Sequence, residues 1–231
     1  MAPSISIIVP VLDEAAEIVV ALTALQAPRA GGAELIVVDG GSGDATVALA
    51  TPLADRVVAA PRGRASQMNA GAALAKGAVL LFLHADTRLP DDPLARIAAG
   101  LGERGVWGRF DVRIAGRSAW LPMVAALMNR RSRLTGIATG DQAMFVTRRA
   151  FRAVGGFPDI PLMEDIALSR RLLKLARPAC LAARVTTSGR RWESQGVWRT
   201  ILRMWRLRLR YFFGADPCRL AREYGYAPRD G

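Results

Sequence analysis

Cysteine and histidine are scarce in this 231-residue chain, which holds two cysteines, Cys180 and Cys218, and a single histidine, His84. No CxxC spacing and no Cys/His cluster occurs, which argues against a structural zinc site. A chain of this length is expected to bury roughly 70% of its unfolded surface, so it needs no disulfides for stability. A cytoplasmic setting fits this cysteine usage best.

Long hydrophobic runs are also missing. The longest wholly apolar run covers residues 119–128 and contains Pro122, whereas a membrane span needs about 20 residues. The first residues carry no basic region and no cleavage pattern, so we expect no signal peptide. The sequence therefore predicts a protein that does not cross a membrane, although it leaves binding to a membrane surface open.

Acidic residues are few in the second part of the chain. Residues 1–103 contain 7 basic and 11 acidic residues, a net charge of −4, while residues 104–231 contain 25 basic and 9 acidic residues, a net charge of +16. With 51% hydrophobic residues the composition is that of a globular protein. The charge asymmetry indicates two different electrostatic roles within one domain and its appendage.

Strand and helix patterns alternate through the first hundred residues. The expected strands cover residues 4–10, 34–39, 56–60 and 78–84, and the expected helices cover residues 14–26, 44–53 and 65–76. Near-continuous apolar strands are typical of a parallel sheet covered on both faces, so the predicted class is α/β. The carboxyl ends of these strands carry Asp13, Asp39 and Asp86, where ligands of such sheets bind.

The pattern becomes more irregular after Pro90. We expect strands over residues 105–114 and 140–147, helices over residues 92–101, 148–154 and 164–174, and an apolar, basic-flanked segment over residues 119–133. The last segment, residues 197–213, predicts a long amphipathic helix with an arginine stripe beside an apolar face.

The strand-end loops suggest a particular ligand. They read Asp13-Glu14, DGGSGD over residues 39–44, and His84-Ala85-Asp86. Glycines let a backbone approach a ligand, and a strand-end carboxylate can hold Mg²⁺ or Mn²⁺ against phosphate oxygens. The glycine run over residues 39–44 is not GxGxxG, and the chain contains no Walker sequence, so a nucleoside diphosphate with a divalent cation fits better than a dinucleotide or P-loop site.

These and later motifs carry a family resemblance. The matching pieces are IVPVLDE over residues 8–14, VVDGGSGD over 37–44, GRASQMNAG over 63–71, HAD over 84–86, GDQ over 140–142 and MED over 163–165. In this order the chain resembles the inverting family 2 glycosyltransferases of the GT-A fold. LFLHADT, WGRFDV, TGDQ and RRWE are similar to the narrower radical-SAM/selenodomain-associated, or arsenosugar-biosynthesis, transferase subfamily.

The resemblance implies a Rossmann-like, mostly parallel central sheet with flanking helices, and a specific set of site residues. The implied nucleotide contacts are Pro10, Asp13, Glu14, Asp39, Gly41, Ser42, Arg64, Asn69 and Ala85. The implied metal ligand is Asp86, with Mn²⁺ or Mg²⁺ as cofactor. The implied donor and acceptor pocket contains His84, Gly140, Asp141, Gln142, Glu164, Arg191 and Trp192. The resemblance makes Asp165 the general base, which agrees with the need of an inverting transfer for one carboxylate that deprotonates the acceptor hydroxyl.

Two positions depart from the family pattern. His84 stands where an aspartate is usual, which removes one carboxylate from the expected metal site. Arg190-Arg191-Trp192 lies where processive relatives carry QxxRW, but the glutamine is absent, which favours a non-processive enzyme. The expected organisation is a glycosyltransferase domain over residues 1–195, with a nucleotide-binding half (1–103) and an acceptor half (104–195), followed by a basic helical extension (196–231).

The basic extension leaves three interpretations open. Its helix could pack on the domain with solvated arginines, or it could form a membrane-interface or homodimer surface together with residues 119–133. The third interpretation is a surface that binds nucleic acid. Nucleic acid is the least favoured, because no recognisable module accompanies the charge. The membrane interpretation would place the protein at the inner face of the membrane.

The leading function is the transfer of a hexose from a nucleotide sugar, with UDP as the favoured nucleotide. Two further functions compete with it. They are a nucleotidyltransferase on a GT-A-like fold and a non-enzymatic basic binding protein. The sequence does not decide whether the acceptor hydroxyl belongs to a small metabolite, a lipid or a glycan.

Overall fold

A single eight-stranded sheet runs through the molecule, in a computed structural model that describes residues 3–226. Its strand order is β3-β2-β1-β4-β7-β6-β8-β5. The first half is parallel and comprises β1 (Ile5–Val11), β2 (Glu34–Asp39), β3 (Arg56–Ala59) and β4 (Val79–Phe82). Every residue of β1 is buried, as expected for an apolar strand covered on both faces.

The second half of the sheet mixes strand directions. β7 (Phe145–Thr147) runs antiparallel to both β4 and β6 (Trp107–Ala115), β8 (Ala179–Ser188) is parallel to β6, and β5 (Thr87–Arg88) is antiparallel to β8. Four of the seven strand pairings are therefore parallel, which confirms the predicted α/β class and mostly parallel sheet. The expected strand over residues 140–147 is wrong in its first part, which forms the 3-10 helix η2 (Gly140–Gln142).

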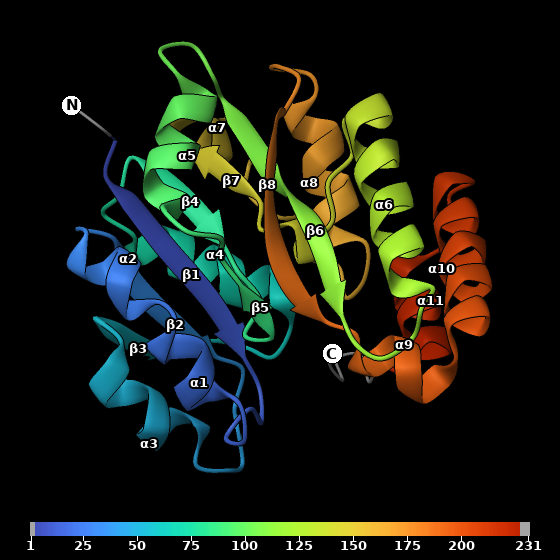
Figure 1. The fold of residues 1–231 in the computed structure, drawn as a ribbon, viewed down its shortest axis with the longest axis horizontal. Helices are drawn as coiled ribbons and strands as arrows, with labels where there is room; N and C mark the ends of the chain where they lie inside the picture. The colour runs from blue at the N-terminus through green and yellow to red at the C-terminus, as the bar shows by residue number, and fades with distance from the viewer. Residues whose placement is uncertain (1–2, 227–231) are drawn as a thin grey trace.

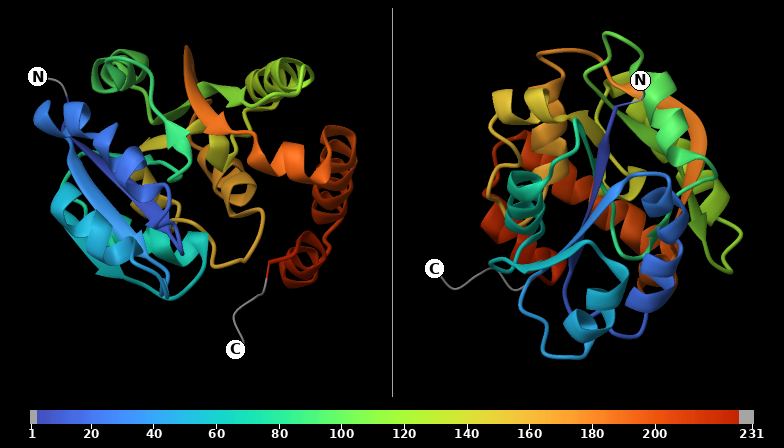
Figure 2. Two further views of the ribbon diagram at one scale, coloured as in Figure 1. Left: turned by 60° about the horizontal axis from the view of Figure 1, so that its bottom comes forward. Right: turned by 90° about the vertical axis from the view of Figure 1, so that its left-hand side faces the viewer.

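Helices cover both faces of this sheet. One core cluster joins the sheet to α1 (Ile18–Thr23), α3 (Thr46–Ala50), α5 (Pro93–Leu101) and α6 (Leu121–Thr135). The other joins it to α4 (Arg64–Leu74), α7 (Arg148–Ala153) and α8 (Glu164–Leu172). The short elements α2 (Gln26–Ala30) and η1 (Thr51–Leu53) complete the first half. The left view of Figure 2 shows α5 and α6 on one side of the sheet and α8 on the other.

Three helices end the described chain: α9 (Arg190–Gln195), α10 (Val197–Phe212) and α11 (Pro217–Tyr224). They lie beside α6, at the end of the molecule opposite α2 and α3 (Figure 1). Leu207, Leu220 and Ala221 form a small third core with Leu162 and Met163, which precede α8. The predicted extension thus packs on the domain, and its last residues, 227–231, lie outside the described range.

The apolar stripe of α10 faces outward. Leu202, Trp205 and Leu209 are each more than half exposed, whereas the buried residues of the helix are Val197, Thr200 and Leu207. Arg206 and Arg210 form ion pairs with Glu223 of α11. The helix therefore packs on the rest of the chain, as one of the three interpretations expects, but through a face other than its apolar stripe. Within residues 3–226, none of the helices combines the length and apolar character needed to cross a bilayer.

Candidate functional site

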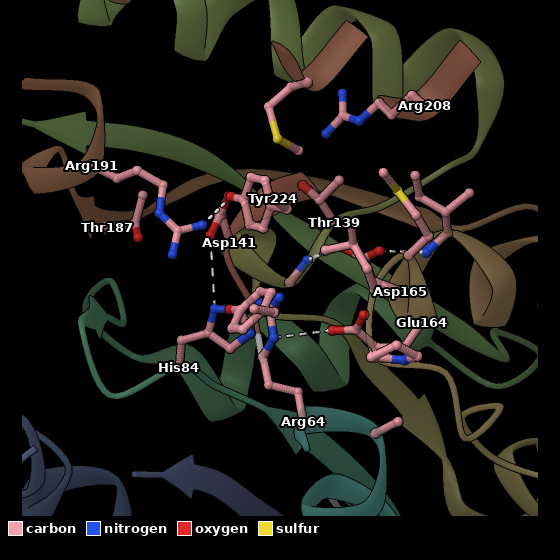
Figure 3. Close-up of a pocket in the computed structure, with 18 of the residues that line it drawn as sticks. Arg64, His84, Thr139, Asp141, Glu164, Asp165, Thr187, Arg191, Arg208 and Tyr224 are labelled. Atoms are coloured by element: carbon pink, nitrogen blue, oxygen red, sulfur yellow. Dashed lines mark hydrogen bonds and ion pairs between the residues drawn. The ribbon is translucent and has the colours of Figure 1, made fainter. Parts of the chain in front are cut away.

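A cavity of about 1020 Å³, called the main cavity below, opens at the carboxyl ends of β1 and β4 and extends between α6 and α10. Figure 3 shows side chains that converge on it from α4, η2, α8, α9 and α11. The sequence-predicted residues that line it are Pro10, Glu14, Arg64, His84, Ala85, Asp86, Gly140, Asp141, Glu164, Asp165, Arg191 and Trp192. The structure thus brings together residues from both halves of the chain.

Asp39 is engaged in the loop that follows its own strand. Its buried carboxylate accepts hydrogen bonds from the backbone amides of Gly41 and Ser42 and from the Ser42 hydroxyl. Asp13 accepts a bond from the amide of Gly43, and the Asp13 amide donates to Ser42 Oγ. These bonds join the loops after β1 and β2 at the sheet edge. Four sequence-predicted nucleotide contacts in these loops do not line the main cavity: Asp13, Asp39, Gly41 and Ser42. Their nucleotide contacts stay a prediction.

Asn69 and Gln142 also point away from the main cavity. The Asn69 amide donates to the carbonyl of Phe157 and accepts from its amide, at 2.8 and 3.0 Å. Gln142 is fully buried, and its side chain forms a capping box with Thr139. Gln67, which was not predicted, does line the main cavity. Its amide donates to the carbonyls of Val11 and Val38 and so fixes α4 against the ends of β1 and β2.

His84 is the histidine of the main cavity, and Asp141 and Arg64 are among its neighbours. Its Nδ1 is 3.8 Å from Oδ1 of Asp141, and burial together with the charge of Arg64 lowers the His84 pKa, so the ring is neutral at pH 7. A Cβ added to Gly140 would lie 2.4 Å from Cε1 of this ring, which explains why a glycine occupies the position. A neutral imidazole can donate one hydrogen bond and accept another.

Arg64 and Glu164 form an ion pair at the wall of the main cavity. The Nε of Arg64 is 3.3 Å from Oε1 of Glu164, whose side chain is almost completely buried. Burial raises the pKa of Glu164 to about 7, although the charge of Arg64 opposes this shift. The arginine is therefore held at the cavity by a carboxyl group that is only partly ionised at neutral pH.

Asp165 is oriented by backbone amides. Its Oδ2 accepts a bond from the amide of Gly140 at 2.9 Å, and its Oδ1 accepts one from the amide of Ile166 at 2.7 Å. Met163, at the N-cap of α8, has a φ of 70°, a backbone conformation that non-glycine residues rarely adopt. The turn that presents Glu164 and Asp165 is thus locally strained, as often occurs at functional sites.

Asp86 is the residue best suited to hold a metal ion. Its carboxylate lines the main cavity, is exposed, and accepts a bond of 3.2 Å from the Thr87 hydroxyl. Among residues 3–226, no cluster of three His, Cys, Asp or Glu side chains could hold a metal ion unaided. Because Mg²⁺ is commonly bound by one or two carboxylates together with substrate phosphates, Asp86 fits a cation that arrives with a nucleotide.

Four residues of the main cavity were not predicted from the sequence, two of them tyrosines in or just after α11. Tyr224 contacts Arg191 through a hydrogen bond and through its ring, whose centroid is 4.8 Å from the guanidinium carbon. Tyr226 lies under Arg64, with a corresponding distance of 5.1 Å. Both tyrosines line the main cavity, as do Arg131 of α6 and Arg208 of α10. No local motif marks these four positions, because they reach the site only through the packing of α6, α10 and α11.

Comparison with known proteins identifies a curated relative of part of the chain. The chain is 41% identical over 110 residues to a PGL/p-HBAD biosynthesis glycosyltransferase from Mycobacterium tuberculosis, a match that covers 44% of this chain and 43% of the relative. The chain thus matches less than half the length of this curated relative.

Solved structures share the fold. A mannosyltransferase from Pyrobaculum calidifontis, in complex with GDP-Man and Mn²⁺, superposes with a TM-score of 0.60 at 24% identity, over 80% of this chain and 57% of that one. TarS from S. aureus, in complex with UDP-GlcNAc, superposes with a TM-score of 0.64 at 19% identity, over 80% and 58% of the two chains.

The sequence profile of the family described as Glycosyl transferase family 2 matches residues 6–154. This region runs from the second residue of β1 through β7 and includes the segments that carry Asp39, Asp86 and Asp141. With more than half of the chain matched and a GT-A glycosyltransferase architecture around the main cavity, the protein belongs to glycosyl transferase family 2.

Proposed function

We propose that this protein is an inverting, non-processive glycosyltransferase that moves a hexose from a nucleoside diphosphate sugar to an acceptor hydroxyl. The observation that carries the proposal is the position of Asp165. Its carboxylate is fixed by two backbone amides inside the main cavity, in the same space as Arg64, Asp86 and Arg191. A general base and groups suited to a diphosphate thus meet in one pocket.

The reaction follows from this placement. Asp165 accepts the proton of the acceptor hydroxyl while the oxygen attacks the anomeric carbon from the face opposite the leaving group. The bond between that carbon and the diphosphate oxygen breaks, and its electron pair leaves with the nucleoside diphosphate. Arg64 and Arg191, which line the same cavity, bind the charge that develops on the diphosphate. A divalent cation held by Asp86 would neutralise part of the same charge.

Several finer assignments belong to the same proposal. UDP is the favoured nucleotide, while the two structural relatives named above contain UDP-GlcNAc and GDP-Man. The motifs LFLHADT and WGRFDV support membership of the radical-SAM/selenodomain-associated subfamily. The free thiols of Cys180 and Cys218 support a cytoplasmic location.

The first experiment separates nucleotide binding from transfer. Calorimetric titration with UDP and with GDP, each with and without Mn²⁺, is expected to show manganese-dependent binding of one nucleotide, and Asp86→Ala is expected to abolish the manganese dependence. Asp165→Asn should keep nucleotide binding but lower the rate of nucleoside diphosphate release from the donor sugar by about 10²- to 10⁴-fold.

Three outcomes would contradict the proposal. Transfer at the wild-type rate by Asp165→Asn would remove the assigned base. Release of pyrophosphate from a nucleoside triphosphate would identify a nucleotidyltransferase. Absence of nucleotide binding, with salt-sensitive binding to DNA or lipid, would identify a non-enzymatic basic protein.

A further inference from the structure

Two arginines that line the main cavity have buried nitrogen atoms without a hydrogen-bond partner in the described part of the chain. Nε and one terminal nitrogen of Arg131, and Nε of Arg208, are buried and have no hydrogen-bond partner within residues 3–226. Burial, followed by the positive charge of Arg208, lowers the pKa of Arg131 to about 10, so Arg131 is charged at neutral pH. Buried, charged donors are stable only when they are paired, so this pair of arginines is suited to an anion.

The two arginines lie apart from the residues assigned to the donor diphosphate. Figure 3 shows Arg208 and Arg64 on opposite sides of Asp165, and Asp165 interacts electrostatically with Arg131. An anion bound by Arg131 and Arg208 would therefore lie on the acceptor side of the general base. There an alcohol hydroxyl on the same molecule, beside the anionic group, could reach the Asp165 carboxylate.

An apolar groove continues the main cavity from this point to the surface. Leu127 and Met128 of α6 and Met204 and Trp205 of α10 supply its apolar lining. Leu127 is 53% exposed and Trp205 is 66% exposed, so the groove is open to solvent along its rim. Exposed apolar surfaces of this kind, next to a few convergent polar groups, are typical of ligand-binding grooves.

We propose that Arg131 and Arg208 bind the phosphate group of an amphiphilic acceptor, whose apolar chain lies in the groove between α6 and α10. A phosphate monoester carries close to two negative charges at neutral pH, which match the two guanidinium groups. The acceptor assignment rests on the proposed glycosyltransferase function. The phosphate and chain site itself is testable without it.

Octyl phosphate, used below its critical micelle concentration, is the probe of this site. Calorimetry on the full chain is expected to show one binding site, with affinity at least tenfold higher than for inorganic phosphate or for tetraethylene glycol monooctyl ether, a neutral amphiphile with the same chain. Arg131→Gln and Arg208→Gln should each weaken octyl phosphate binding about tenfold or more, because each removes a charge-assisted contact.

Matched variants test the two parts of the site. Arg199→Gln changes an exposed arginine of α10 outside the main cavity and should leave octyl phosphate binding unchanged. Leu127→Gln should weaken it, whereas Leu202→Gln, a comparably exposed leucine outside the main cavity, should not. Manganese-dependent nucleotide binding is measured on every variant and is expected to stay at the wild-type level, which also shows that each variant is folded.

The outcomes separate this inference from the proposed function. Equal binding of the neutral amphiphile, equal binding of inorganic phosphate, or wild-type affinity in both arginine variants would overturn the inference, while intact nucleotide binding would leave the proposed function standing. If the wild-type protein binds octyl phosphate but no nucleotide, the proposed function fails. The phosphate site then stands, but its assignment to an acceptor does not.

Vesicles identify the source of the phosphate amphiphile. The test compares phosphatidylcholine alone with mixtures that contain phosphatidic acid. Arginine-dependent binding to the mixed vesicles supports the site with a bilayer lipid as its occupant. Binding of octyl phosphate without binding to the mixed vesicles supports the site with a soluble amphiphile as its occupant.

Discussion

Glu164 is a buried carboxyl group whose ionisation falls near neutral pH. Burial raises its pKa from 4.5 to about 7 in the folded chain, so between these two values the folded protein holds a proton that the unfolded chain releases. The free energy of unfolding should therefore fall as the pH rises from about 4.5 to about 7, by about 3 kcal/mol at most. Glu164→Gln should remove this contribution.

Urea denaturation at pH 5 and pH 8 measures this effect as the difference between wild type and Glu164→Gln, so that other titrating groups cancel. The wild type is expected to lose more stability than the variant between the two pH values. An equal loss in both proteins would show that Glu164 is not the group responsible.

Arg109 is a charged side chain without solvent exposure. It forms an ion pair with Asp111, and Arg133 binds the other carboxylate oxygen of Asp111 at 2.6 Å. Asp111→Asn leaves the Arg109 charge buried without compensation, and we expect a loss of about 3–5 kcal/mol in the free energy of unfolding. Arg133→Gln is the control, because Arg133 is 41% exposed and should cost about 1 kcal/mol or less. Similar losses in both variants by urea denaturation would contradict a special role for the buried pair.

At the scale of elements, the sequence predicted the first half well. The strand over residues 34–39 is confirmed residue for residue as β2, because an apolar run with both faces buried leaves no alternative period. β8 was missed, since its exposure follows no clean alternation and its pairing with β6 is interrupted by a register shift. The tertiary pairing with β6, rather than local pattern, makes this segment a strand.

The candidate site divides in the same way. Motif residues at strand ends, such as His84 and Asp86, could be found because parallel strands end at one edge of a sheet. Asn69 lies in a matching motif, but its side chain bonds to Phe157, which is 88 residues away in the chain. Arg131 and Tyr226 reach the main cavity through helix packing alone, so no spacing in the sequence marks them.

The 3-10 helix η2 lies in close contact with His84, in the loop that follows β4. Gly140→Ala would place a Cβ 2.4 Å from Cε1 of His84, so the ring or η2 must shift. We expect a loss of about 1–3 kcal/mol in stability from overpacking, and slower transfer because the Gly140 amide also orients Asp165. His84→Ala should relieve most of the loss in stability, so a double-mutant cycle with the two substitutions checks the contact. Additive effects of the two changes would contradict it.

At the scale of the whole molecule, the two halves of the chain are joined by the sheet and by several side-chain contacts, one of which is made by Asn69. The sheet passes from the first half to the second between β4 and β7. On the α4 and α8 face, Asn69 of α4 joins the segment before α8 through two bonds with the backbone of Phe157. This bridge holds the element that carries Arg64 next to the element that carries Glu164 and Asp165.

Asn69→Ala removes both bonds of the bridge and leaves the amide and carbonyl of Phe157 unpaired. We expect a loss of about 1–3 kcal/mol in the free energy of unfolding by urea denaturation, and slower transfer because one of the contacts that position α4 relative to the segment before α8 is lost. Asn69→Asp keeps the acceptor for the Phe157 amide but not the donor for its carbonyl, and should fall between wild type and the alanine variant. Nucleotide affinity separates this role from the one that the sequence predicts. If Asn69 contacts the nucleotide, its loss will weaken nucleotide binding with little change in stability. If it bridges the halves, stability will fall while the isolated nucleotide binds with near wild-type affinity.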